Sequence, residues 1–577
     1  MREVESWRNS MQFMSSALHN REIPYDARVS IEFSIPLTSK RVDFILTGQD
    51  SSRRDVAVIV ELKQWSALQA TDKDGIVVTR LGGREVETAH PSYQAWTYAA
   101  LIEDYNETVR EEQIELKPCA YLHNLDSADQ LRDTRYADHI TRAPAFIAED
   151  ALKLSDFLGR YVRYGDHSDI LYRIEHGRIR PSKSLADCLA QMMSGNTEFH
   201  LIDDQKLVYE TALHLADKAQ RGPRQVLIVE GGPGTGKSVV AINLLVELTQ
   251  REMLAQYVSR NAAPRAVYAA KLAGTLRKNR IHNLFRGSGA FMDAEARVFD
   301  ALIVDEAHRL NEKSGLYGNQ GENQIKELLG ASKFSVFFLD EDQRVTLKDL
   351  GSAEEIRTWA KHHSAEVHTL SLESQFRCGG SSAYLAFLDD ALQLRQTANP
   401  TITPDEFDFR VIDDPVELHQ SIREKNQGRT TARMVAGYCW DWHSKRDPTA
   451  DDIVLPDYGY AAQWNLVRDG SLWIIAPGSV EQVGCIHTCQ GLEVDYIGVI
   501  IGPDFVVRDG HVVTDATQRS RMDASVRGIR TWLRNEPQKA QPVADRIIKN
   551  TYRTLMTRGQ KGCYIHCTDA ETADYFR

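Results

Sequence analysis

Residues 225–240, QVLIVEGGPGTGKSVV, constrain the fold of this chain more than any other stretch. An apolar strand at 226–229 leads into a glycine-rich turn and the start of a helix, in the spacing G-x-x-x-x-G-K-[ST]. Glycines in such a turn let backbone N–H groups close around a phosphate, and the helix N-terminus adds partial positive charge. The stretch therefore predicts a nucleoside triphosphate site, whose contacts we assign to Gly231, Gly232, Pro233, Gly234, Thr235, Gly236, Lys237 and Ser238.

Two side chains of this phosphate loop (residues 231–238) have predicted tasks. Lys237 reaches the β- and γ-phosphates, and Ser238 ligates the accompanying Mg²⁺. A chance glycine pattern in a loop would lack the apolar strand before it and the helical pattern of residues 239–248 after it. Both are present, so we predict ATP and Mg²⁺ as cofactors.

The composition limits domain number and location. A chain of 577 residues is too long for one core, and about 150 residues per domain predicts three or four. No apolar run approaches the ~20 residues that cross a bilayer, and the charged start MREVESWRNS is no signal peptide. Eight scattered cysteines without paired C-x-x-C motifs argue against structural zinc and suit reduced thiols. We therefore expect a cytoplasmic protein with no membrane partner.

Three strands predicted near the N-terminus carry acidic residues and a lysine. These strands, which follow an amphipathic helix, cover residues 29–36, 41–46 and 56–62. Glu61 and Lys63 lie two apart and so share one face of their strand. With Asp43 brought beside them, they give two carboxylates for a hard divalent cation and a lysine near the attacked phosphate, as nucleases require. The alternative is that Asp43 and Glu61 are surface acids at strand ends.

A helix predicted over residues 91–102 adds a second signal, because Gln94 and Tyr98 lie four apart on one face. Together these residues resemble the PD-(D/E)xK nuclease superfamily, and the Gln-x-x-x-Tyr helix resembles its RecB-like branch. The resemblance implies roles as follows: Asp43 and Glu61 as ligands of Mg²⁺, with Mn²⁺ as an alternative, Lys63 as catalytic lysine, and Gln94 and Tyr98 as residues that orient the site or the DNA.

Two points about this region are less defined by the sequence. The first acid of the superfamily lies on its opening helix, and Glu3, Glu5 and Glu32 are equal candidates for it. His90, just before the predicted helix, is expected to cap the helix or to pack rather than to bind a metal.

We predict four segments along the chain. They are a nuclease-like domain at 1–164, a helical linker at 165–198 with one helix at 185–193, a first RecA-like lobe at 199–370, and a second at 371–577. Gln205 stands about thirty residues before Lys237, where many helicases place a glutamine that reads the adenine edge. The alternative for Gln205 is an ordinary helical glutamine.

An acid pair follows the predicted core strand at 301–304. In a phosphate-loop protein, Asp305 at this position would hold Mg²⁺ through water, and Glu306 would polarise the attacking water. His308 either packs or couples ATP to the nucleic-acid site. After another predicted strand, 334–339, the pattern D-x-x-Q at 340–343 resembles the γ-phosphate sensor of superfamily 1 helicases, with Gln343 as sensor. Leu339 replaces the usual glycine there.

The second half supplies groups that would act on the nucleotide from across a cleft. Arg377, in the sequence QFRC, could reach the γ-phosphate. Trp440 and Trp442 either stack on bases, at about 1–3 kcal/mol each, or belong to the core. The remaining motifs are T-x-Q-G-x-E at 488–493 and NTYRTLMTRG at 550–559, which holds Arg553 and Arg558.

In this order the motifs resemble a superfamily 1 helicase, and their wording resembles the Schlafen-like DNA/RNA helicase domain family. The resemblance implies that Arg377 and Arg558 are arginine fingers, that Glu493 and Gln490 couple the second lobe to ribose and nucleic acid, and that Arg553 serves either chemistry or structure. With a nuclease-like domain ahead, the chain is similar to bacterial nuclease–helicase (Nhi-like) proteins of antiviral defence.

The sequence thus predicts an α/β protein: a PD-(D/E)xK nuclease fold followed by two RecA-like parallel-sheet lobes. Its expected function is ATP-driven translocation along nucleic acid, most simply DNA with a single-stranded portion, coupled to Mg²⁺-dependent cleavage. The net charge of −12 argues mildly against a nucleic-acid coat but leaves room for a basic channel. Three alternatives are an N-terminal domain that binds without cutting, an ATP-dependent sensor, and a restriction-type enzyme with partner subunits.

Overall fold

The computed structural model describes residues 2–19, 23–178, 185–314, 319–376, 378–397, 401–404, 407–427, 431–489 and 491–577. The chain forms two compact units. The first unit comprises Met1–Ser184 and Thr197–His214, and the second comprises Leu185–Asn196 and Leu215–Arg577. The last of the boundaries between them along the chain, between His214 and Leu215, falls inside one helix, α8 (Asp203–Arg221).

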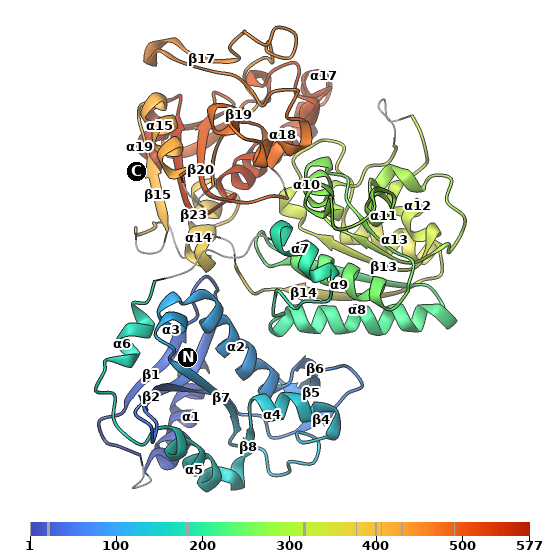
Figure 1. The fold of residues 1–577 in the computed structure, drawn as a ribbon. Coiled ribbons are helices and arrows are strands. Elements are labelled where there is room, and N and C mark those ends of the chain that lie inside the picture. The colour runs from blue at the N-terminus through green and yellow to red at the C-terminus, as the bar shows by residue number, and fades with distance from the viewer. Residues whose placement is uncertain are drawn as a thin grey trace. The chain divides into compact units, whose positions relative to one another are not determined.

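The first unit is built on a five-stranded mixed sheet (Figure 1). Its strands, in spatial order, are β1 (Arg28–Ser34), β2 (Arg41–Gln49), β3 (Asp55–Lys63), β7 (Glu115–Leu122) and β8 (Ala145–Ile147). The pairs β1–β2 and β2–β3 are antiparallel, whereas β3–β7 and β7–β8 are parallel. Its helices are α1 (Arg2–Leu18), α2 (Pro91–Tyr105), α3 (Glu107–Glu111), α4 (Ala137–Arg142), α5 (Ala151–Tyr161) and α6 (Ile170–Glu175).

Strict alternation along β3 decides which side chains face which helix. Val56, Val58 and Val60 are fully buried and belong to a core cluster that also contains residues of α1 and α5. Because neighbouring residues of a strand point to opposite faces, Glu61 and Lys63 face the other side, where α2 lies against β3 and β7. The predicted strands and the predicted helix of this region are confirmed.

A second, three-stranded sheet lies beside the first and was not predicted. Its strands are β4 (Leu68–Ala70), β5 (Ile76–Leu81) and β6 (Arg84–Ala89). Gly82 and Gly83 form the turn between β5 and β6, both with positive φ, as a two-residue hairpin turn requires. Residues 165–198, expected to be a helical linker, contain α6 in the first unit and α7 (Leu185–Met193) in the second, where α7 lies against α9 and α10.

The second unit contains two separate parallel sheets. The first has the spatial order β11 (Phe285–Arg286), β10 (Ala255–Val258), β12 (Phe299–Val304), β13 (Ser332–Leu339), β9 (Gln225–Gly231) and β14 (Glu366–Leu372). Each strand runs parallel to its neighbours, so the carboxyl ends of the strands meet at one edge. Its helices are α9 (Lys237–Gln250), α10 (Ala262–Leu272), α11 (Lys278–Leu284), α12 (Gln324–Ala331) and α13 (Ala353–His362).

The second parallel sheet has the order β15 (Asp408–Val411), β23 (Gly559–Cys567), β20 (Val494–Ile501), β16 (Ala432–Ala436) and β19 (Val483–Gly484). Its helices are α14 (Ser382–Ala391), α15 (Pro415–Lys425), α16 (Ile486–Cys489), α17 (Ile529–Asn535), α18 (Pro537–Met556) and α19 (Ala570–Phe576). Two hairpins, β17–β18 (Ile453–Leu455, Tyr460–Ala462) and β21–β22 (Phe505–Arg508, His511–Thr514), complete the unit. The chain is therefore α/β throughout, with two RecA-like parallel sheets in its second unit.

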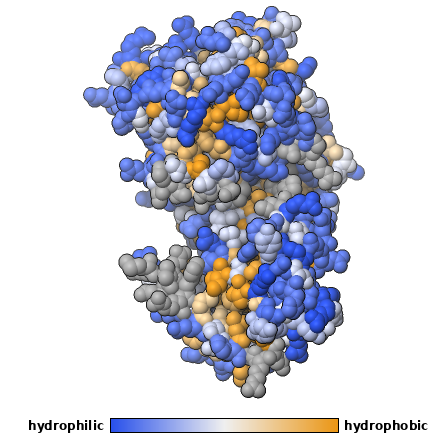
Figure 2. Space-filling model, turned by 90° about the vertical axis from the view of Figure 1, so that its left-hand side faces the viewer, coloured by the Kyte–Doolittle hydropathy of each residue, from blue (hydrophilic) through white to orange (hydrophobic). Residues whose placement is uncertain are grey.

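None of the eight cysteines, all of which lie among the described residues, forms a disulfide. Among the described residues, no helix is long and apolar enough to cross a bilayer. Hydrophilic residues predominate on the face of the molecule drawn in Figure 2, and apolar residues form smaller patches between them.

Candidate functional site

The phosphate loop begins at Gly231, the last residue of β9, and ends in the first turn of α9, as the sequence predicts. Gly234 and Gly236 have φ values of 81° and 82°, a backbone conformation that favours glycine. The Lys237 ammonium group turns back into the loop and donates to the carbonyl oxygens of Gly231 at 2.7 Å and Gly232 at 2.6 Å. These two bonds hold the Lys237 side chain inside the loop, where the phosphates of a bound nucleotide would accept hydrogen bonds from the same ammonium group.

The carboxylate of Asp305 ties the phosphate loop to the neighbouring strands. Its Oδ2 atom accepts from Ser238 Oγ at 2.7 Å and from the Tyr257 hydroxyl at 2.8 Å, and its Oδ1 atom accepts from the Glu306 amide at 2.9 Å. Ser238 and Asp305, the predicted Mg²⁺ residues, are therefore in direct contact. Tyr257, on β10, was not predicted, since nothing in its local pattern distinguishes it from a core tyrosine.

Glu306 is a buried acid held in an unusual backbone conformation. Its φ is 52°, in the left-handed region, where a residue other than glycine is strained and often functional. Its Oε2 atom has no hydrogen-bond partner among the described residues. Burial raises the pKa of Glu306, and Asp305 adds to the rise, whereas Arg309, Arg558 and Lys237 oppose it. A buried carboxylate with a raised pKa and an unpaired oxygen suits the general-base role that the sequence predicts for Glu306, and that role stays a prediction.

His308 and the D-x-x-Q turn connect two strand ends. The His308 ring accepts, at Nδ1, from the amide of Asp340 at 3.3 Å, and its burial lowers its pKa to about 3. Asp340 caps the turn that follows β13, and Gln343 donates to its Oδ2 atom at 2.7 Å. Leu339, in place of the usual glycine, ends β13 without disturbing this turn. His308 thus lies between the acid pair and the turn that carries the predicted sensor.

The QFRC segment lies on the phosphate loop. Gln375 donates to the carbonyl of Pro233 at 2.7 Å, and the amide of Phe376 donates to Gly234 at 2.9 Å. Arg377, the next residue, lies outside the described residues, as does Gln490. Their predicted roles therefore stay predictions.

Gly491 brings the second parallel sheet's T-x-Q-G-x-E motif against Glu306. Its φ is 79°, and a Cβ atom at this position would lie 2.8 Å from Pro264 and 3.0 Å from Glu306 Oε1. Only glycine fits such a gap without movement. Glu306 of the acid pair and Gly491 of this motif, 185 positions apart in sequence, therefore meet at one carboxylate.

Arg558 and Glu493 lie on the same side as Gly491. The Arg558 guanidinium is 1% exposed and donates to the carbonyls of Thr554 at 2.9 Å and Leu492 at 3.3 Å. Its charge lowers the pKa of Glu306, which places it within electrostatic reach of the proposed base. Glu493 is exposed and accepts a hydrogen bond from Gln560.

Arg553 has the structural role that the sequence left open. Its Nε atom lies 2.5 Å from the Asp389 carboxylate of α14, and both side chains are at most 4% exposed. The exposed Arg395 also pairs with Asp389. Trp440 and Trp442 likewise pack, partly buried, against the core cluster beneath the second parallel sheet, which favours the core alternative for them.

In the first unit, Asp43, Glu61 and Lys63 come together on the α2 side of the sheet. Phe44 pairs with Val60, so the antiparallel register places Asp43 opposite Glu61. Lys63 Nζ lies 2.6 Å from Glu61 Oε1, with side-chain exposures of 17% and 3%. Asp43 Oδ2 accepts from the Leu62 amide at 2.7 Å. Burial, with help from Asp43, raises the pKa of Glu61 to about 8.

The predicted helix residues complete this cluster. Gln94 donates to the Tyr98 hydroxyl at 2.9 Å, and that hydroxyl donates to Asp203 at 2.7 Å. His90 caps α2 by accepting from the Ser92 amide at 3.1 Å, and its other ring nitrogen lies 2.9 Å from the Leu131 carbonyl oxygen, so the expected capping role is confirmed. Glu32 pairs with Arg41 at 3.8 Å, while the side chains of Glu3 and Glu5 lie outside the described residues.

The carboxylates of the first unit suit a magnesium ion that retains water. Glu61 Oε2 is buried without a hydrogen-bond partner among the described residues, and Asp43 stands opposite. No group of three or more histidine, cysteine, aspartate or glutamate side chains in the described parts of the chain is arranged to hold a metal. Mg²⁺ is commonly bound by only one or two carboxylates together with water and phosphate oxygens, so two acids fit it.

Gln205 belongs to the first unit, within Thr197–His214. It is 3% exposed, and its Oε1 atom accepts from the Ile202 amide at 3.4 Å near the start of α8. Its predicted contact with adenine stays a prediction.

Comparison with known proteins identifies the family. Residues 224–569 match the family described as Schlafen group 3, DNA/RNA helicase domain, over more than half of the chain. The chain belongs to this family. The prediction of a helicase domain is thereby confirmed for residues 224–569.

Two individual proteins are also similar to this chain. The uncharacterized protein YPL245W of Saccharomyces cerevisiae is 23% identical over 382 residues, which are 60% of this chain and 82% of that protein. The crystal structure of the Pif1 helicase from Candida albicans is 11% identical and covers 65% of this chain and 97% of that one, with a TM-score of 0.25.

Gly491→Ala tests whether the approach of the second sheet's motif to Glu306 matters for ATP turnover. We expect a loss of about 10-fold or more, since the added methyl must displace either Pro264 or the carboxylate. Gly459→Ala is the matched control, because Gly459 also has positive φ, 61°, but nothing lies within 4 Å of the new methyl. Equal turnover in the two variants, measured by phosphate release, would contradict the close approach.

Arg553→Met should lower the free energy of unfolding by about 3 kcal/mol, since it removes one partner of a buried ion pair. Arg410→Met is the control: Arg410 pairs with Asp408 at 2.8 Å but is 59% exposed, and such pairs contribute at most about 1 kcal/mol. Denaturant unfolding of both variants measures the difference. Equal midpoints would show that Arg553 has no structural role.

Proposed function

We propose that this chain is an ATP-driven nucleic-acid translocase whose first unit is a metal-dependent DNA nuclease. The observation that carries the motor half is the meeting of Lys237, Asp305, Glu306 and Gly491 from both parallel sheets at one edge. The observation that carries the nuclease half is the buried Glu61–Lys63 pair opposite Asp43, beside Gln94 and Tyr98.

In the motor, the residues prepare a site for charge that develops on the γ-phosphate. Lys237 already donates to the loop carbonyls, and a bound phosphate would replace them as acceptor. Glu306, whose pKa is raised by burial, would take a proton from the attacking water. Arg558 lies near Glu306 and would oppose the negative charge of the transition state. Mg²⁺, held by Ser238 and Asp305, would screen the phosphates.

Closing and opening of the contact between the two sheets would convert ATP turnover into movement along nucleic acid. The contact rests on residues that respond to the nucleotide, because Gly491 touches Glu306 and Gln375 touches the phosphate loop. A nucleotide that moves either group would therefore move the second sheet's motifs. Family membership in the DNA/RNA helicases supports this use of the energy.

In the nuclease, the residues would bind and polarise a phosphodiester. Burial lowers the pKa of Lys63, but the negative charges of Glu61 and Asp43 raise it by more, so Lys63 remains charged. Its ammonium would stabilise the attacked phosphate, while Gln94 and Tyr98 would orient the strand. A divalent cation bound by Asp43 and Glu61 would supply an activated water and screen charge. The resemblance to nuclease–helicase proteins supports a role in antiviral defence.

Lys237→Ala and Glu306→Gln should each reduce ATP turnover by about 100-fold or more, because each removes a group that acts in the transition state. Lys218→Ala is the control, as Lys218 is 45% exposed and pairs on the surface with Glu366 at 2.7 Å. The assay measures phosphate release with and without single-stranded DNA or RNA. A rate of ATP turnover that changes with neither single-stranded DNA nor single-stranded RNA would favour a sensor rather than a translocase.

Lys63→Ala and Glu61→Gln should reduce cleavage of end-labelled DNA by about 100-fold or more, and EDTA should abolish it. Lys117→Ala is a matched control. Lys117 and Glu115 both lie on β7, the strand next to β3, and form an ion pair with the same two-residue spacing, but Lys117 is more exposed, at 26%. Single- and double-stranded DNA and RNA, with and without ATP, define the substrate. Degradation that survives Lys63→Ala and Glu61→Gln would indicate a first unit that binds without cutting.

A further inference from the structure

The start of α8 places a further acid in the proposed nuclease cluster. Asp203 Oδ2 accepts from the Tyr98 hydroxyl at 2.7 Å and lies 2.7 Å from the Lys40 ammonium. Tyr98 is the residue bound by Gln94, so one chain of hydrogen bonds runs from Gln94 to Asp203. Asp203 lies 140 residues beyond Lys63 in sequence, outside the segment in which the superfamily's motifs are found.

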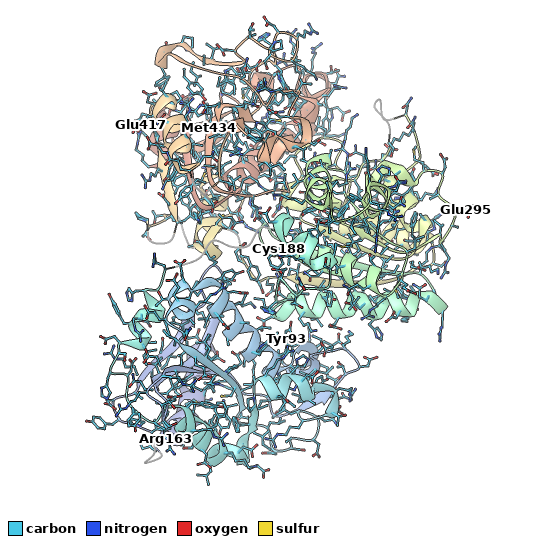
Figure 3. All side chains as sticks on the ribbon, in the orientation of Figure 1. Tyr93, Arg163, Cys188, Glu295, Glu417 and Met434 are labelled. Carbon is cyan, nitrogen blue, oxygen red and sulfur yellow. The ribbon has the colours of Figure 1, made fainter. Side chains whose placement is uncertain are left out.

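Several contacts fix the stretch around Asp203 to the first unit. Lys206 pairs with Asp74 at 2.8 Å, and the same aspartate pairs with His139 at 2.8 Å. The hydroxyl of Tyr93, which is labelled in Figure 3, donates to the Leu201 carbonyl at 2.5 Å. These bonds lie on both sides of Asp203 along the chain, so its position is built into the unit.

The backbone conformation and the buried carboxylate of Asp203 both lower the stability of the fold, so folding alone does not explain them. Its φ is 38°, in the left-handed region. Its Oδ1 atom is buried without a hydrogen-bond partner among the described residues, which costs about 1–3 kcal/mol for a polar group. The side chain as a whole is 15% exposed. Such costs gather at functional sites, where a fixed geometry matters more than stability.

We propose that Asp203 is a positioning residue of the nuclease site, acting through Tyr98 and Lys40. It fixes the direction of the Tyr98 hydroxyl, which in turn accepts from Gln94, and it holds the Lys40 ammonium beside the cluster, where the ammonium can meet a phosphodiester. It also adds negative charge near Asp43 and Glu61, which favours a divalent cation. This inference rests on the proposed nuclease function.

The charge states of its partners support this role. Burial lowers the pKa of Lys40, but the charge and hydrogen bond of Asp203, together with the charge of Asp204, raise it by more, so the ammonium keeps its charge. Burial, with the charges of Asp203 and Glu61, holds the pKa of Tyr98 well above its usual range, so the hydroxyl remains a donor. A neutral asparagine at position 203 would keep the shape of the side chain but lose the ion pair with Lys40.

The test uses the full chain with the Asp203→Asn variant and two readouts. Cleavage of labelled DNA with Mg²⁺ should fall about 10- to 100-fold, and Mn²⁺ affinity, measured by electron paramagnetic resonance, should weaken about 10-fold, as for other groups that orient a metal site. Asp72→Asn is the control, because Asp72 is an aspartate of the same unit that is 72% exposed, and it should change both readouts by less than about twofold.

A double variant shows whether Asp203 acts through Tyr98. With Tyr98→Phe the hydroxyl is gone, so adding Asp203→Asn should slow cleavage by much less than it does in the wild type. Independent, multiplicative losses would overturn the proposed route, and faster cleavage by Asp203→Asn would show that the carboxylate blocks the site instead. If the wild-type chain cuts no nucleic acid, the nuclease proposal fails, and unchanged Mn²⁺ affinity in Asp203→Asn would separately overturn the role of Asp203.

Discussion

The motor depends on the hydrogen bond between Ser238 and Asp305. It joins the first turn of α9 to the end of β12 across the intervening strand β13, and the Tyr257 hydroxyl on β10 donates to the same carboxylate oxygen. Because all these strands are parallel, their carboxyl ends lie at one edge and the connection is short. One carboxylate thus joins three elements at the edge of the sheet where we propose that the nucleotide and its cation bind.

Two glutamates, one in each unit, share the same set of physical properties. Glu61 and Glu306 are both buried, both have their pKa raised first by burial, and each has an Oε2 atom without a partner in the described parts of the chain. An unpaired buried carboxylate oxygen lowers stability, so neither site is explained by folding. Each instead leaves an acceptor available for the ligand proposed for it, a proton of water for Glu306 and a cation for Glu61.

Local patterns predicted the parts of this structure that short stretches of sequence decide. The apolar strand and glycine spacing placed β9 and α9, and the two-residue repeat placed Glu61 and Lys63 on one face of β3. The β5–β6 hairpin was missed although its signal, two glycines between alternating apolar residues, is present at Gly82 and Gly83. Tyr257 and Arg553 could not be assigned, since their partners Asp305 and Asp389 lie 48 and 164 residues away and leave no local trace.

Asp203 shows most clearly why a site can extend past the segment that its motifs define. Its partners Tyr98 and Lys40 precede it by 105 and 163 positions, and nothing in the sequence IDDQ distinguishes a helix-capping acid from one that orients a tyrosine. The first unit nevertheless includes Thr197–His214, which carries Asp203, Lys206 and the carbonyl of Leu201 that Tyr93 binds. A fragment that ended at residue 164, where the sequence places the end of the nuclease-like domain, would lack all three. In that fragment Tyr98 and Lys40 would face solvent in place of a carboxylate, so the chain of hydrogen bonds from Gln94 would end in water. Inactivity of such a fragment would therefore say nothing about the activity of the whole chain.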